Sequence, residues 1–211
     1  MTRRSRGRFL VLEGLDGAGT TTQSARLAAW LRERRRRVHL TAEPSRGPVG
    51  VLVRQVLRGE VSGAGGGALD PSALALLFAA DRLDHLAGEI EPRLACGIDV
   101  VGDRYALSSL AYQSVATGDP RWVGQINRLA PAPDVTIFLR VRPSVALRRR
   151  YAASSRRELF EVPAFQRRVA AAYERALARL RAQGQRVAVL DGERPEEEVA
   201  AAVARVVERL R

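Results

Sequence analysis

The sequence predicts an α/β fold in which a parallel sheet of five strands is flanked by helices. Short apolar runs rich in leucine or β-branched residues alternate with longer segments of helical periodicity, which is the order expected of βα units. The chain has 211 residues, 46% of them hydrophobic, which is ample for a packed core and excludes a disordered or fibrous chain. No repeat or interdomain linker interrupts the pattern, so we expect one domain over residues 1–211.

The predicted elements follow in order along the chain. Strands are expected where short apolar runs occur, at residues 9–12, 38–41, 98–101, 135–139 and 187–190. Helices are expected at residues 21–34, 71–95, 164–182 and 195–210. The second of them begins at Asp70-Pro71, a capping residue followed by proline at the first helical position. Two segments break the periodicity: the glycine-rich residues 59–69 predict a flexible surface loop, and residues 151–162 predict a mobile flap.

The charge of the chain indicates an anionic partner. The net charge is +12, and all 35 basic residues are arginine. Nucleic acid, an anionic membrane surface and phosphorylated small molecules all fit this balance. A single cysteine excludes an internal disulfide framework, and we expect Cys96 to be a buried, inert thiol. The apolar run after the basic N-terminus is too short for a signal peptide, and no stretch reaches the ~20 residues of a membrane span, so a cytoplasmic protein is expected.

A glycine-rich loop lies between the first predicted strand and the first predicted helix. Its spacing matches the phosphate-binding pattern G-x-x-x-x-G-K-[ST] at Gly14, Gly19 and Thr21. Glycines let backbone N–H groups turn inward, and the helix N-terminus behind them adds to a cradle for phosphate oxygens. The candidate ATP-binding residues are Gly14, Leu15, Asp16, Gly17, Ala18, Gly19, Thr20 and Thr21. The hydroxyl of Thr21 is a candidate ligand of Mg²⁺.

The lysine of this pattern is replaced by Thr20. The substitution removes the point charge that reaches the β- and γ-phosphates, while the backbone cradle is unaffected. Without the lysine, a plain structural turn is an alternative interpretation of the loop. The substitution itself has two explanations, loss of all lysines from the chain or loss of chemistry, and the sequence leaves both open.

Four segments, read together, resemble the thymidylate kinase family. They are the loop residues 13–23 apart from Thr20, the helical residues 76–82, the stretch 103–113 (D-R-Y-A-L-S-S-L-A-Y-Q), and residues 133–139. The resemblance spans roughly residues 9–192 in the family's order. It implies a P-loop NTPase type of nucleoside monophosphate kinase with a short lid at about residues 148–162. It further implies transfer of the γ-phosphate of ATP to dTMP with Mg²⁺, in a homodimer.

The resemblance places thymine recognition on Phe78 and Arg82. The two residues are four apart on a predicted helix, so they face the same direction. An aromatic ring can stack on a base, and a guanidinium can hydrogen-bond its edge. The alternatives are core packing for Phe78 and a salt bridge from Arg82 to Asp81 or Asp84.

Further site residues follow from the resemblance. Asp103 and Arg104 come directly after a predicted strand, where open α/β sheets bind ligands. Arg104 is the expected clamp on the acceptor phosphate, and Asp103 a ligand of Mg²⁺ or of water; a surface ion pair between the two is the alternative. The remaining positions are Ser109 and Tyr112 for the base and deoxyribose, Asp16 between donor and acceptor, and Arg54 for the acceptor phosphate.

The predicted flap carries the candidate catalytic arginines Arg156 and Arg157. An arginine that reaches the transferring phosphoryl group can supply charge that the loop lacks. A solvated face of the lid helix is the alternative for each of them.

The sequence leaves two other interpretations of the whole chain open: a weakened or inactive nucleotide-binding homologue, and a non-specific nucleic-acid binder. Aromatic residues make up only 5% of the chain, and the basic run at residues 32–37 has just Trp30 nearby, so specific nucleic-acid binding is not expected.

Overall fold

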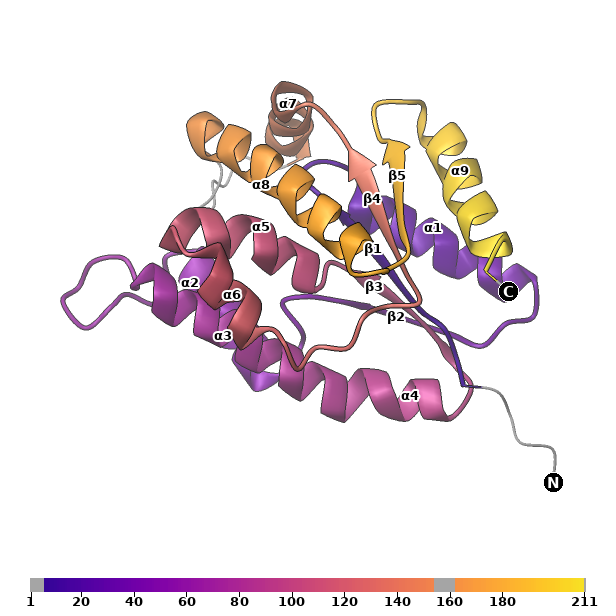
Figure 1. Ribbon diagram of the computed structural model, residues 1–211, viewed down its shortest axis with the longest axis horizontal. Helices are drawn as coiled ribbons and strands as arrows, with labels where there is room; N and C mark the ends of the chain where they lie inside the picture. Colours follow the sequence, from indigo (N-terminus) through magenta and orange to yellow (C-terminus); the bar gives the residue numbers. More distant parts are fainter. Residues whose placement is uncertain (1–5, 154–161, 211) are drawn as a thin grey trace.

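The structure of the protein, a computed structural model, describes residues 6–153 and 162–210. Its strands form one parallel sheet in the order β2-β3-β1-β4-β5 (Figure 1). The strands are β1 (Phe9–Gly14), β2 (Val38–Ala42), β3 (Asp99–Asp103), β4 (Val135–Arg140) and β5 (Val187–Asp191). These are the five predicted strands, shifted at their ends by one or two residues. The predicted fold class is therefore confirmed.

Helices cover both faces of this sheet. The helical elements are α1 (Thr20–Glu33), α2 (Pro48–Leu57), α3 (Pro71–His85), η1 (Leu86–Ile90), α4 (Glu91–Ala95), α5 (Ala106–Thr117), α6 (Pro120–Ile126), α7 (Pro143–Ala153), α8 (Pro163–Ala182) and α9 (Glu196–Glu208). Helix α1 packs with α9, and α5 packs with α8 on the opposite face (Figure 1). Alternate side chains of β1 face opposite sides: Phe9 and Val11 join a cluster with η1 and α4, whereas Leu10 and Leu12 join the larger core with α1.

Two predicted features of the local structure need correction. The helix expected at residues 71–95 is interrupted by the π-turn η1, in which the N–H of Glu91 donates to the carbonyl of Leu86, five residues back. Cys96 is exposed rather than buried, because it ends α4 in a surface turn before β3. Helices α2, α5, α6 and α7 lie outside the four helices expected from periodicity, and each has 12 residues or fewer.

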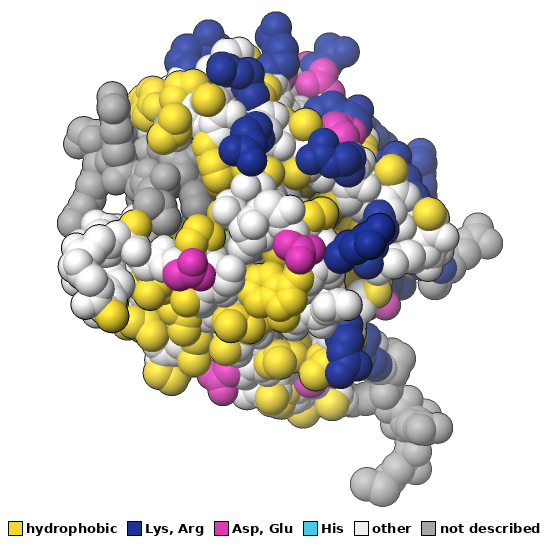
Figure 2. All heavy atoms as spheres, turned by 60° about the vertical axis from the view of Figure 1, so that its left-hand side comes forward, with side chains coloured by type: hydrophobic (Ala, Val, Ile, Leu, Met, Phe, Trp, Pro, Cys, Tyr) yellow, Lys and Arg dark blue, Asp and Glu magenta, His cyan; other side chains and the backbone are white. Residues whose placement is uncertain are grey.

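The parallel register brings the ligand-binding loops to one edge of the sheet. Leu12 of β1 pairs with Asp103 of β3, and Gly14 of β1 pairs with Leu139 of β4. The carboxyl ends of the three central strands therefore lie together, as open α/β sheets require for a binding crevice. Figure 2 shows positively charged side chains gathered along the upper part of one face of the molecule, with hydrophobic side chains below them. None of the described helices is long and apolar enough to span a membrane.

Candidate active site

The loop between β1 and α1 has the backbone geometry of a phosphate cradle. Gly17 and Gly19 have φ angles of 86° and 93°, which glycine adopts without strain. Helix α1 begins at Thr20 with no side-chain cap and no acidic residue in its first turn. Its first N–H groups and the positive end of its dipole are therefore left to an anion. This is the phosphate-binding loop that the sequence predicts.

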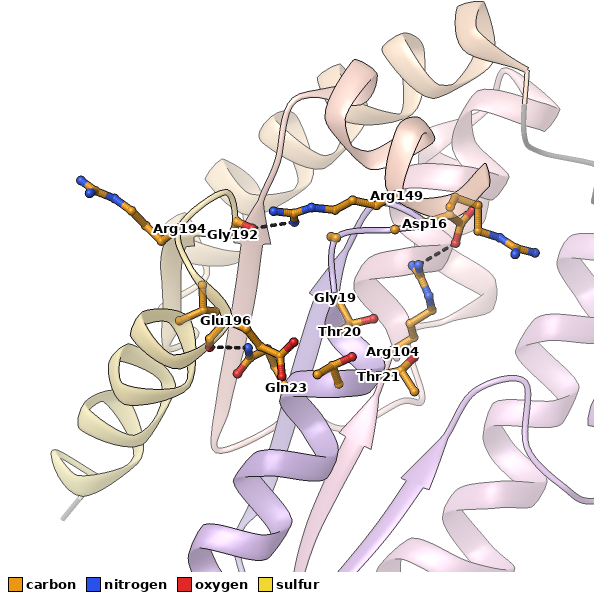
Figure 3. A pocket seen from close by; sticks show the side chains of 15 residues that line it. Asp16, Gly19, Thr20, Thr21, Gln23, Arg104, Arg149, Gly192, Arg194 and Glu196 are labelled. Carbon is orange, nitrogen blue, oxygen red and sulfur yellow. Dashed lines mark hydrogen bonds and ion pairs between the residues drawn. The ribbon is translucent and has the colours of Figure 1, made fainter. Parts of the chain in front are cut away.

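A cavity of about 610 Å³ lies over this loop. The predicted loop residues from Asp16 to Thr21 line it on one side, while Gly14 and Leu15 do not. The opposite side contains Gly192, Arg194 and Glu196, which follow β5. Arg149 of α7 reaches across the open end of the loop and donates to the carbonyl of Gly192 at 2.8 Å (Figure 3). The cavity has the size and polar lining expected for a nucleotide.

Arginines supply the positive charge of this cavity in place of the missing lysine. Thr20 occupies the lysine position and is buried at the start of α1. Arg104, Arg149, Arg150 and Arg194 all line the cavity. The predicted catalytic residues Arg156 and Arg157 lie outside the described residues.

Thr21 and Asp103 form a pair suited to a divalent cation. The hydroxyl of Thr21 donates to Oδ2 of Asp103 at 2.5 Å. The other carboxylate oxygen of Asp103, Oδ1, is buried and has no hydrogen-bond partner among the described residues. Hydroxyl and carboxylate oxygens are the ligands that Mg²⁺ prefers, and an unsatisfied buried carboxylate oxygen is costly. These residues therefore fit the metal.

Arg104 and Asp16 form the central ion pair of the site. The guanidinium of Arg104 donates to Oδ1 of Asp16 at 2.7 Å and to the carbonyl of Gly14 at 2.8 Å. Tyr112 donates its hydroxyl to Oδ2 of Asp16 at 3.0 Å and accepts from the Asp16 N–H at 3.1 Å. Burial is the largest single effect and lowers the pKa of Arg104, but the electrostatic effects of Asp16, Tyr112, Tyr173 and Asp103 together raise it more, so the net shift is upward. Arg104 pairs with Asp16 rather than with its neighbour Asp103, which contradicts the surface ion-pair alternative.

Glu13 is a polar residue of the site that the sequence analysis did not single out. Its carboxylate is fully buried and accepts from the N–H of Tyr105 at 2.8 Å, from the N–H of Ser108 at 3.1 Å and from the Ser108 hydroxyl at 2.6 Å. Burial raises its pKa to about 7, although the charge of Arg104 and these hydrogen bonds lower it. Ser108 and Tyr173 contact both Glu13 and Arg104, so Glu13 helps to orient the central arginine. The sequence feature that could have identified Glu13 is its position as a charged residue at the end of a predicted apolar strand.

A second cavity, of about 170 Å³, adjoins the central ion pair. Five of the predicted acceptor residues line it: Phe78, Arg82, Arg104, Ser109 and Tyr112. Arg54, the sixth, does not; it donates from Nη1 to the carbonyl of Pro44 at 2.6 Å and so supports the wall of the cavity from behind. The prediction that Arg54 contacts an acceptor phosphate therefore receives no support from the geometry.

Arg82 is fixed in this cavity by partners that the sequence did not predict. It is 1% exposed, and its Nε and Nη2 atoms donate to Oε2 of Glu43 at 3.0 and 2.6 Å. Nη2 also donates to Ser109 at 3.1 Å, and Nη1 donates to Asn127. The alternative of a salt bridge to Asp81 or Asp84 is wrong, because the ion pair forms with Glu43. A guanidinium has five N–H donors; with these partners among the described residues, one N–H of Nη1 is left for a ligand.

The basic run at residues 32–37 makes contacts within the chain. The guanidinium of Arg34 lies 3.9 Å from the ring centroid of Trp30, and Arg36 donates to the buried carboxylate of Asp99 at 2.7 Å. Arg37 donates to the carbonyl of Cys96. These arginines stabilise the turn before β2, and the run contains no aromatic residue on which a nucleobase could stack. The geometry therefore gives no support to nucleic-acid binding.

Comparison with known proteins identifies the family. The family model described as thymidylate kinase matches residues 12–203. A probable thymidylate kinase of Pyrobaculum calidifontis is 43% identical over 202 residues, covering 95% of this chain and 96% of the relative. A probable thymidylate kinase of Pyrobaculum aerophilum is 41% identical over 206 residues (96% and 97%), and the thymidylate kinase of Thermomicrobium roseum is 43% identical over 202 residues (92% and 91%). With its phosphate-binding loop, its two adjoining cavities and these relatives, the chain belongs to the thymidylate kinase family.

Proposed function

We propose that the protein transfers the γ-phosphoryl group of ATP to dTMP, giving dTDP and ADP, with Mg²⁺ bound. One observation carries this proposal: Asp16 and Arg104 line both cavities. A nucleotide on the phosphate-binding loop and a monophosphate in the second cavity would therefore meet at this ion pair. Transfer between two bound nucleotides requires that arrangement, since positioning supplies much of the rate of phosphoryl transfer.

The reaction follows from the charges at the junction. A phosphate oxygen of dTMP attacks the γ-phosphorus of ATP while the bond to the β,γ-bridging oxygen breaks, and ADP leaves with the bonding electrons. Arg104 can pair with the acceptor phosphate and stabilise negative charge on the transferring group. Asp16 holds the arginine in place through its 2.7 Å ion pair. A magnesium ion held by Thr21 and Asp103 would neutralise charge on the β- and γ-phosphates.

The second cavity supports a pyrimidine deoxynucleotide as the acceptor. Phe78 is half-buried in its wall and offers a ring on which a base can stack. The remaining N–H of Arg82 can donate to a carbonyl on the base edge. Tyr112 is held by Asp16, and its ring would lie against the 2′ carbon of the sugar, where it disfavours a ribose hydroxyl. The thymidylate kinase names of the relatives agree with this acceptor.

The arginines of α7 and of the loop after β5 support activity without the lysine. Arg149, Arg150 and Arg194 line the same cavity over the phosphate-binding loop as Thr20. The same proposal includes a single domain of residues 1–211, a lid at about residues 148–162, and Arg156 or Arg157 as the catalytic arginine. A homodimer and a cytoplasmic location are carried as further proposals from the family.

A coupled assay of ADP release tests the proposed function. Purified protein should release ADP from ATP in the presence of dTMP, and chelation of Mg²⁺ should abolish the release. Parallel reactions with dUMP and with ribonucleoside monophosphates determine the acceptor. No turnover with any of these monophosphates would refute the proposal and favour an inactive nucleotide-binding homologue.

A further inference from the structure

A buried polar network leads from the acceptor cavity toward the outer edge of the sheet. Its centre is His85, the last residue of α3, whose side chain is 2% exposed. The Nδ1 atom of His85 lies 3.6 Å from Oε1 of Glu43, and its Nε2 atom lies 2.8 Å from the hydroxyl of Thr41. Glu43 is also the carboxylate that holds Arg82 in the cavity. His85 is therefore one residue removed from the guanidinium that contacts the acceptor.

The hydrogen bonds of Thr41 determine which nitrogen of a neutral His85 carries its proton. The Thr41 hydroxyl donates its single hydrogen to Oε1 of Glu89 at 2.7 Å. Burial raises the pKa of Glu89, but hydrogen bonds from His39 and Thr41, together with the charges of the two histidines, lower it more, to about 2, so Glu89 is an ionised acceptor. The oxygen of Thr41 is left to accept from Nε2–H of His85. Nδ1 of the neutral ring is then an acceptor.

Neutral His85 thus leaves two buried acceptors facing each other. Among the described residues, neither Oε1 of Glu43 nor Nδ1 of His85 has a hydrogen-bond partner. Unpartnered buried polar atoms are unfavourable and rare in folded proteins. A second proton on the ring makes Nδ1 a donor toward Oε1 of Glu43 and satisfies both atoms.

The surrounding charges favour this second proton. The titratable and charged groups that face the ring come from three places in the fold: His39 of β2 with Glu43 just after it, Glu89 of η1, and Asp81 and Arg82 of α3. Burial lowers the pKa of His85, but the carboxylate of Glu43, followed by those of Glu89 and Asp81, raises it more. The pKa of His85 therefore lies above its ordinary value, and protonation persists to higher pH than in an exposed histidine.

We propose that His85 is a positioning residue for acceptor binding: its protonated ring donates to Glu43 and holds that carboxylate in the orientation that presents Arg82 to the acceptor base. The inference rests on the proposed function, in which Arg82 contacts the base. Oε2 of Glu43 serves Arg82, and Oε1 serves His85. When the ring loses its proton as the pH rises, Oε1 loses its donor, the carboxylate is no longer held on that side, and affinity for the base falls.

Substitutions of His85 by asparagine and by glutamine separate the role of its Nδ1 atom from that of its Nε2 atom. The amide nitrogen of asparagine is two bonds from Cβ, as Nδ1 of histidine is, whereas that of glutamine is three bonds away, as Nε2 is. His85→Asn therefore places a permanent donor toward Glu43, and His85→Gln places the donor toward Thr41 and leaves Oε1 of Glu43 without one. His39→Gln, at the more exposed of the two histidines, keeps a donor at the Nε2 position toward Glu89 and is the matched control.

Calorimetric titration with thymidine from about pH 6 to about pH 9 tests the proposal. Thymidine is the first probe because the phosphate of dTMP has its own ionisation near pH 6; dTMP is then titrated in the same way. The wild type and His39→Gln should lose about three- to tenfold in affinity as the pH rises, the range expected for one hydrogen bond. His85→Asn should bind with nearly constant affinity over this range, and His85→Gln should bind weakly at every pH.

Equal pH dependence in the wild type and His85→Asn, or full affinity in His85→Gln, would overturn the proposal. A second measurement uses the wild type alone: because the chain has two histidines, NMR can follow each ring, and the pKa of His85 should rise further when ligand binds. An unchanged His85 pKa on binding contradicts the coupling. Failure of both thymidine and dTMP to bind would refute the proposed function itself, whereas binding without pH coupling refutes this inference alone.

Discussion

Gly17 and Gly19 form a matched pair of sites in the phosphate-binding loop. A Cβ atom on Gly17, whose φ is 86°, would lie 2.1 Å from the carbonyl oxygen of Ala146 in α7. A Cβ atom on Gly19, whose φ is 93°, would meet no atom within 4 Å. Gly17→Ala and Gly19→Ala therefore share the backbone strain, and only Gly17→Ala adds a steric conflict with α7.

The expected losses of stability follow from this difference. A non-glycine residue in the left-handed region costs about 1–2 kcal/mol, which is the expected loss for Gly19→Ala. The carbonyl of Ala146 belongs to the backbone, so Gly17→Ala must also displace α7, and overpacking of this kind adds about 1–3 kcal/mol. Since 1 kcal/mol corresponds to about 2–4 °C in a chain of this length, Gly17→Ala should melt about 2–12 °C below Gly19→Ala.

Thermal and urea unfolding without nucleotide measures both variants against the wild type. Omitting nucleotide removes any contribution from ligand binding, which would stabilise the folded state by mass action. Equal melting temperatures for Gly17→Ala and Gly19→Ala would refute the close packing of α7 on the loop. That result would also remove the geometric reason for placing Arg149 and Arg150 over the donor phosphates.

Three further predictions concern charge in the site. Thr20→Lys should change kcat by less than about tenfold in the coupled assay, because arginines already line the cavity; an increase of about a hundredfold would show that the natural site lacks charge. The pKa of Glu13 in the folded state is about 7, above its ordinary value of 4.5, so protonated Glu13 stabilises the fold fully at low pH. The free energy of unfolding should therefore fall by about 3 kcal/mol as the pH rises to 7. Glu13→Gln should abolish this pH dependence in urea titrations, and an unchanged dependence of the unfolding free energy on pH would contradict it. Arg82→Lys should raise KM for dTMP by about 10- to 100-fold with a smaller change in kcat, since lysine cannot replace two hydrogen bonds to Glu43; a KM within about twofold of the wild type would exclude a role in base recognition.

Local sequence patterns were sufficient for most of the fold. The strands were predictable because each is a short apolar run between polar segments, and the phosphate-binding loop because its glycines follow a strand directly. The sequence pattern did not predict features that depend on contacts between distant segments. The π-turn at Leu86–Ile90 lies within a continuous run of helical backbone, so the sequence reads as one regular helix. The exposure of Cys96 depends on where its turn meets the surface.

The candidate site was predictable in its residues but not in their partners. Phe78 and Arg82 share a helix face at a spacing of four, and Asp103 and Arg104 stand at the end of a strand; this spacing agrees with a site, but the resemblance to the thymidylate kinase family assigned both pairs to it. The partner of Arg82 is 39 residues earlier in the chain, at the end of β2. No periodicity relates two residues on different elements, so the sequence pointed instead to the nearest carboxylates, Asp81 and Asp84.

The sequence by itself determined that this chain has a parallel α/β sheet, a phosphate-binding loop without its lysine, and a set of arginines for two anionic substrates. Tertiary structure alone decided that β2 lies beside β3 at the sheet edge, which brings Glu43 to Arg82 and to His85. It also decided that Glu13 is fully buried and that Arg104 pairs with Asp16. The physical reason is that propensity and periodicity act over a few residues, whereas strand order, burial and ion pairing depend on how distant segments pack together.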